Sequence, residues 1–169
     1  MKRNGFTIIE LVIVILLIGI IAAIAAPRLG NISSTKAGAF IDKLRADIRY
    51  AQNLAMTRNL RSRVSFGITG YSIKTSATST CSAFPLAADP ATGQTFTVDL
   101  TAAPYSGSGI TLTLPAMTCL EYNSIGKPYD CTGLGNVCAT ISSGMTVTVN
   151  SSSGVAGSVT ISSQTGAVN

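Results

Sequence analysis

The chain has 169 residues, of which 46% are hydrophobic and 11% are charged, and it contains no histidine. Its net charge of +5 is unevenly distributed: residues 1–74 hold eleven Lys and Arg with three acids, whereas residues 75–169 hold one Lys and four acids. Without histidine, Ser-His-Asp and Cys-His catalysis are excluded. Ser-Lys and paired-carboxylate chemistries stay open, but the acids after residue 75 are scattered, so we predict a protein that is not an enzyme and binds no cofactor.

Residues 6–26 are apolar apart from one charge, Glu10. A helix of this length is about 32 Å long and matches a hydrocarbon core of about 30 Å. Lys2 and Arg3 precede it, and positive charge before a first apolar helix stays in the cytoplasm. We therefore predict a leader peptide at residues 1–5, a transmembrane helix at 6–26 and an extracytoplasmic remainder.

An ordinary secretory signal peptide, cut at the small residues 23–25, is the alternative for this N-terminal region. The apolar stretch is longer than the 7 to 15 residues that are usual in a signal peptide. A carboxylate inside such a stretch is also costly without a function. Both observations favour the membrane helix.

Residues 5–15, GFTIIELVIVI, resemble the N-terminal signature of type IV pilins and of the pseudopilins of type II secretion systems. In that superfamily a prepilin peptidase cuts after the glycine, the new N-terminal phenylalanine is N-methylated, and a glutamate stands fifth in the mature chain. Gly5, Phe6 and Glu10 match these positions. Gly19 and Pro27 fall where pilins often carry helix-loosening residues, and proline also removes a backbone donor, so we expect a kink near Pro27.

The resemblance also implies partners and a location. The subunit would form a homo-oligomer, or co-assemble with other pilins, on a filament assembly platform. It would stand in the inner membrane with its head outside, and afterwards in a cell-surface or periplasmic filament. The sequence of the head does not distinguish a major pilin from a minor pilin or a secretion pseudopilin, because all three share the same N-terminal chemistry.

Glu10 has a physical reason to be charged. Cleavage after Gly5 leaves an amine on Phe6, one helical turn from Glu10. A carboxylate in apolar surroundings needs a partner. Our hypothesis is that Glu10 neutralises the Phe6 amine of an adjacent subunit and sets the axial register of assembly. The alternative is an acid tolerated near the membrane interface.

Residues 27–59 have the pattern of an amphipathic helix. Its apolar residues recur at three-to-four spacing and must cover a core: Ala37, Phe40, Ile41, Leu44, Ile48, Ala51, Leu54 and Ala55. The opposite face is charged. It is either a solvated surface or a contact between subunits.

Residues 60–169 change to the two-residue period of strands. The expected strands are 61–67 and 71–74, joined as a hairpin, followed by 95–100, 110–114, 119–122, 137–141, 145–150 and 158–162. We therefore predict an α+β fold, with one long N-terminal helix packed on an antiparallel, strand-rich, sandwich-like head.

The head resembles, more loosely, the H-type pseudopilins and related minor pilins. The similarity lies in residues 48–55 of the helix, a glycine turn in 120–127, and a final strand with glycine in 159–166. Some minor pilins of that group bind DNA through basic residues after this glycine, but none follows Gly166 here. Because phosphate binding needs clustered cations, a DNA-uptake role is disfavoured, and only Arg58, Arg61 and Arg63 form a basic cluster.

The four cysteines are Cys81, Cys119, Cys131 and Cys138. They form no C-x-x-C pair, and histidine is absent, so no metal site is predicted. In an exported protein disulfides are expected. Of the three pairings, we favour Cys131 with Cys138 and Cys81 with Cys119.

Two functional classes remain. The first is a filament subunit; the second is a membrane-anchored or released binding domain that does not polymerise. The N-terminal mass of the mature protein separates them, because methylated Phe6 indicates the prepilin pathway.

Overall fold

The computed structural model describes residues 7–29, 32–77, 84–115, 117–131 and 138–169, without the side chains of residues 25–29 and 32. The chain divides into two compact units, Met1–Ile32 and Ser33–Asn169. Each unit is described by itself.

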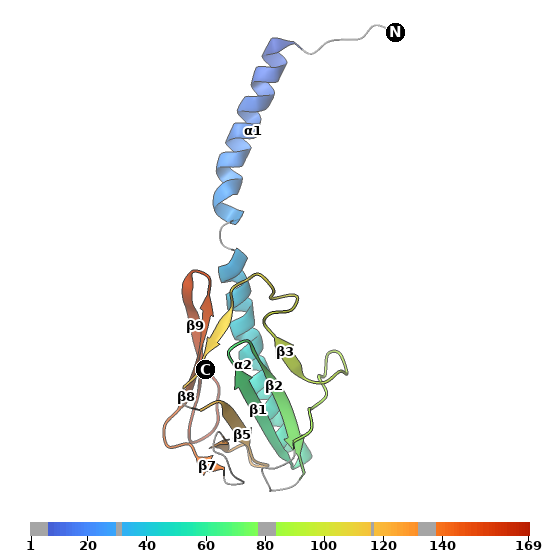
Figure 1. Cartoon of the computed structure of the whole chain (residues 1–169), viewed down its shortest axis with the longest axis vertical. Helices are drawn as coiled ribbons and strands as arrows, with labels where there is room; N and C mark the ends of the chain where they lie inside the picture. The colour runs from blue at the N-terminus through green and yellow to red at the C-terminus, as the bar shows by residue number, and fades with distance from the viewer. Residues whose placement is uncertain (1–6, 30–31, 78–83, 116, 132–137) are drawn as a thin grey trace. The chain divides into compact units, whose positions relative to one another are not determined.

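The first unit contains helix α1, Ile8–Leu29 (Figure 1). The helix continues through Gly19 and Pro27, so its backbone assignment shows no break at the predicted kink. The following helix begins at Ile32, so the predicted helix of residues 6–59 is described as one helix before residues 30–31 and one after them. Within the part of the chain that the structure describes, no helix combines the length and the apolar character needed to cross a membrane. The transmembrane prediction for residues 6–26 is thus not confirmed.

Helix α2, Ile32–Arg58, is the long helix of the second unit, which we call the head, and the strands of the head lie alongside it (Figure 1). Its predicted apolar stripe is buried, and Phe40, Leu44 and Ile48 have no exposed surface. Ile41 is the partly buried member of the stripe. The helix ends where Asn59 takes a positive φ of 50°, a conformation that asparagine tolerates at helix ends.

The strands of the head form two antiparallel sheets. Their bounds are β1 (Arg61–Gly67), β2 (Gly70–Ser76), β3 (Thr97–Asp99), β4 (Thr111–Thr113), β5 (Cys119–Tyr122), β6 (Pro128–Asp130), β7 (Ala139–Thr140), β8 (Met145–Ser151) and β9 (Gly154–Ile161). One sheet has the order β3-β2-β1-β5-β6-β7, and the other has the order β4-β8-β9. The predicted α+β fold, with helices followed by a strand-rich head, is confirmed.

One continuous core joins α2 to both sheets. Val64 of β1 and Ile73 of β2 are buried in it together with Val147 of β8. Side chains alternate along a strand, so Arg61 and Arg63 of β1 lie on the sheet face opposite to the one that carries Val64. All four residues of β5 are buried, which means that this strand is covered on both faces.

Candidate functional site

Helix α1 presents apolar side chains on every side. Its large hydrophobic residues from Ile8 to Ile24 are all exposed, from 43% for Val14 to 86% for Ile8. A helix that is apolar all round is stable only when something else covers it. Among the described residues of this unit nothing covers α1, so burial against another molecule would stabilise its apolar surface.

The N-terminus of α1 is capped by Thr7. The Glu10 backbone N–H donates to Thr7 Oγ1 at 3.3 Å, and the Leu11 N–H donates to Thr7 O at 3.2 Å. Thr followed three residues later by Glu is the capping-box pattern, and an acid in the first turn also favours the helix dipole. The T-x-x-E spacing of Thr7 and Glu10 is the sequence signal for this capping role, which the predictions above do not include. Glu10 therefore has a structural use besides the proposed pairing.

The predicted processing residues, Gly5 and Phe6, lie outside the described residues. Pairing between Glu10 and the Phe6 amine therefore stays a prediction. Gly19 lies in α1, where an added Cβ would meet nothing within 4 Å. Packing within this chain does not require glycine there, and its role in assembly also stays a prediction.

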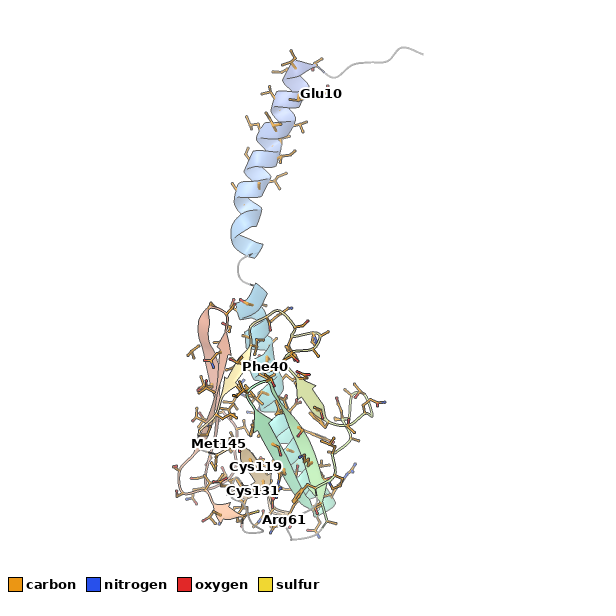
Figure 2. The ribbon with its side chains drawn as sticks, in the orientation of Figure 1. Glu10, Phe40, Arg61, Cys119, Cys131 and Met145 are labelled. Carbon is orange, nitrogen blue, oxygen red and sulfur yellow. The ribbon has the colours of Figure 1, made fainter. Side chains whose placement is uncertain are left out.

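A second constellation surrounds Glu121 in β5, whose side chain has no exposed surface. Arg61 Nη1 donates to Glu121 Oε1 at 2.5 Å, and Arg63 Nη2 donates to Oε2 at 2.9 Å. The thiols of Cys131 and Cys138 lie 3.1 and 3.5 Å from the same Oε2. In Figure 2, Arg61, Cys119 and Cys131 gather in one region of the head, apart from Phe40.

Strand pairing explains why these groups meet. Arg63 lies directly opposite Glu121 across the β1–β5 ladder, and directly opposite residues share one face of a sheet. The Cys131 N–H donates to Cys119 O at 3.3 Å, which brings the residue after β6 beside the first residue of β5. Cys138 precedes β7, the strand paired with β6.

The electrostatics of this constellation keep Glu121 ionised. Burial alone would raise the pKa of the Glu121 carboxyl, but hydrogen bonds from Arg63, Cys131 and Arg61 outweigh burial and lower that pKa. Hydrogen bonding with Cys119, together with burial, raises the pKa of Cys131. The same hydrogen bond and the nearby Arg63 lower the pKa of Cys119.

The predicted basic cluster of Arg58, Arg61 and Arg63 does not present all of its charges together, because two of the arginines contact Glu121. Arg61 and Arg63 bind Glu121, and the Arg63 guanidinium also lies 4.0 Å from the centre of the Phe84 ring. These two guanidiniums are therefore directed at a buried carboxylate rather than presented together with Arg58 as a phosphate-binding surface.

The predicted disulfides, Cys131 with Cys138 and Cys81 with Cys119, are not confirmed. Cys119, Cys131 and Cys138 carry thiols in the structure. The thiols of Cys131 and Cys138 both donate to Glu121 Oε2. Cys81 itself lies outside the described residues.

The two glycines singled out in the head meet at one junction. Gln52 Nε2 of α2 donates to Gly126 O at 2.9 Å and to Thr165 O at 2.8 Å, and the buried Tyr122 hydroxyl donates to Gly166 O at 3.1 Å. Both glycines have positive φ, 80° and 69°. The three head segments noted in the sequence are thus joined through Gln52.

Comparisons with known proteins match part of this chain. The family described as a prokaryotic N-terminal methylation motif matches residues 1–26. The type IV narrow pilus major component PilA5 of Thermus thermophilus is 44% identical over 55 residues, which are 32% of this chain and 47% of the relative. The match thus spans about half the length of that relative. No solved structure matches the chain.

The two matches bear on residues that the sequence analysis had already selected. The motif covers Gly5, Phe6 and Glu10, whereas membership of the H-type pseudopilin group stays a prediction. The methylation motif and the pilin match together support the predicted resemblance of this chain to the type IV pilin and pseudopilin superfamily.

Proposed function

We propose that the chain is a structural subunit of an extracytoplasmic type IV filament and that it assembles through α1. The observation that carries this proposal is the exposure of the large apolar side chains of α1 from Ile8 to Ile24, with Glu10 as the charge in its first turn. Packing such helices against one another buries their apolar surface. The N-terminal methylation motif supports the same function.

The finer steps follow from the superfamily. A prepilin peptidase cuts after Gly5, Phe6 is methylated, and subunits join on an assembly platform, alone or with other pilins. Before assembly the apolar helix needs another apolar environment, so we place the unassembled subunit at the inner membrane with its head outside. Glu10 then pairs with the Phe6 amine of the neighbouring subunit.

The experiment must separate the two uses of Glu10. Glu10→Gln removes the charge but keeps a side chain that suits the third position of a capped helix. Thr7→Ala keeps the charge and removes the capping hydroxyl, at a cost of about 1 kcal/mol of helix stability. Sheared filaments are quantified from cells that produce each variant. We expect Glu10→Gln to lose filaments and Thr7→Ala to retain them.

Two controls make the result decisive. The N-terminal mass of each mature variant shows whether cleavage and methylation took place, so a processing defect is not mistaken for an assembly defect. Wild-type amounts of filament from processed Glu10→Gln would refute the pairing. A wild-type protein that retains Met1, or begins at Ala26, would instead favour the non-polymerising class.

A further inference from the structure

We propose that Glu121, Cys131 and Cys138 form a binding site for one borderline-soft divalent cation, with Zn²⁺ as its representative. One carboxylate oxygen and the two sulfurs lie within 4.8 Å of one another. This inference does not depend on filament formation.

The donor set suits such an ion. Thiolates and a carboxylate are zinc ligands, at about 2.3 Å and about 2.1 Å from the metal. Glu121 is completely buried, and Cys131 and Cys138 are half-buried, so the donors are already held by the fold. Cys119, whose sulfur interacts with Cys131, lies next to the set but outside it.

The charge balance also favours a divalent ion. Both thiol sulfurs lie within hydrogen-bond distance of one oxygen, Glu121 Oε2. A divalent cation that replaces these two protons, which leave to solvent, keeps the net charge of the cluster unchanged. Arg61 can keep its hydrogen bond to Oε1 and act as an outer-shell partner that orients the carboxylate.

A disulfide between Cys131 and Cys138 is the competing use of the same thiols. It would remove both S–H donors from Oε2 and leave the arginines as the partners of a fully buried carboxylate. Metal binding instead gives that oxygen a stronger partner. No metal site is predicted from the sequence, because the cysteines form no C-x-x-C pair and histidine is absent. Glu121 lies 10 and 17 positions from the two cysteines along the chain, and strand pairing brings the three donors together.

The test uses the full chain in detergent, equilibrated with zinc chloride and then dialysed against metal-free buffer. Zinc per chain is measured by mass spectrometry, and alkylation followed by intact mass counts the thiols. We expect one zinc per chain and thiols that resist alkylation until a chelator is added. Less than half a zinc per chain, or a protein lacking two hydrogens through a Cys131–Cys138 disulfide, would overturn the proposal.

Matched serine variants identify the ligands. Cys131→Ser and Cys138→Ser should each weaken zinc binding at least about tenfold, because each loses one thiolate ligand. Cys119→Ser is the control and should keep wild-type stoichiometry. Equal zinc binding by Cys138→Ser, or loss only in Cys119→Ser, would contradict the assignment. If a variant fails to fold, cobalt chloride added to the wild-type protein still tests the proposal. Ligation by thiolates must then produce a thiolate-to-cobalt absorption band, and the absence of this band would contradict the proposal.

Discussion

Close contacts with Tyr122, Gln52 and Gly126 explain why glycine stands at position 166. A Cβ on Gly166 would lie 2.6 Å from a Tyr122 ring carbon, 2.9 Å from Gln52 Nε2 and 3.0 Å from Gly126 O. The first two distances are shorter than a Cβ tolerates and the third is unusually tight, and the positive φ adds backbone strain for other residues. Because Gly166 has no side chain, Tyr122 can donate to Gly166 O and Gln52 can donate to Gly126 O and Thr165 O. Gly166 therefore serves packing in this fold.

Gly166→Ala should therefore destabilise the head more than its backbone angle alone predicts. Gly93 is the matched control, because its φ of 71° equals that of Gly166 within 2° and an added Cβ there meets nothing within 4 Å. We expect a loss of about 1 kcal/mol for Gly93→Ala and about 2–4 kcal/mol for Gly166→Ala in the free energy of unfolding. Urea unfolding measures both, and equal losses would show that the contacts do not matter.

Two buried tyrosines should make the head sensitive to alkali. Burial, together with Asp47, which accepts a hydrogen bond from the Tyr71 hydroxyl at 2.5 Å, raises the pKa of Tyr71 far above its ordinary value. Burial also raises the pKa of Tyr122. In the unfolded chain both ionise near pH 10. Their contribution to stability is therefore complete below about pH 10 and is lost as the pH rises further.

The free energy of unfolding should fall above about pH 10 by up to about 1.4 kcal/mol per pH unit for each of these tyrosines. Tyr71→Phe should make this fall less steep, while costing about 1 kcal/mol at neutral pH through the lost hydrogen bond. Urea unfolding at a series of pH values measures the slope. A slope unchanged by Tyr71→Phe would contradict the assignment.

Elements differ in how far the sequence predicts them. The α2 stripe and β5 were predicted because their apolar periods are clear, and β5 has the predicted bounds, Cys119–Tyr122. Strand β6 was missed because it has three residues and begins with Pro128. The Glu121 cluster was also missed, since its ion pairs join residues 58 and 60 positions apart, and no local pattern reports such a pairing.

The buried stripe of α2 should carry much of the stability of the head. Ile48→Ala removes a side chain with no exposed surface and should cost about 2–5 kcal/mol. The same substitution at Ile125, whose side chain is 76% exposed, should change the free energy of unfolding by no more than about 0.5 kcal/mol. Thermal and urea unfolding of the two variants test this difference. Similar losses at both positions would place the core elsewhere.

At the scale of the whole molecule, the buried core and the exposed apolar helix belong to different parts of the chain. Every residue of the buried core lies at position 37 or later, whereas the exposed large hydrophobics from Ile8 to Ile24 belong to α1. The head therefore contains its own core, and α1 adds surface that needs an external partner. A filament subunit requires this division, because the same head must be stable both before and after its helix is packed.

A variant lacking residues 1–32 should keep a folded head and lose the ability to form filaments. It retains α2 from Ser33 onward and all of the buried core, so it should unfold cooperatively and remain monomeric. Circular dichroism during heating and analytical ultracentrifugation measure these properties. Adding Ile48→Ala to the same variant should lower its melting temperature by roughly 6 °C or more, which shows that the transition reports the packed core. A shortened chain without a cooperative transition would show that α1 is needed for folding, and the division between a self-contained head and an assembly helix would then be wrong.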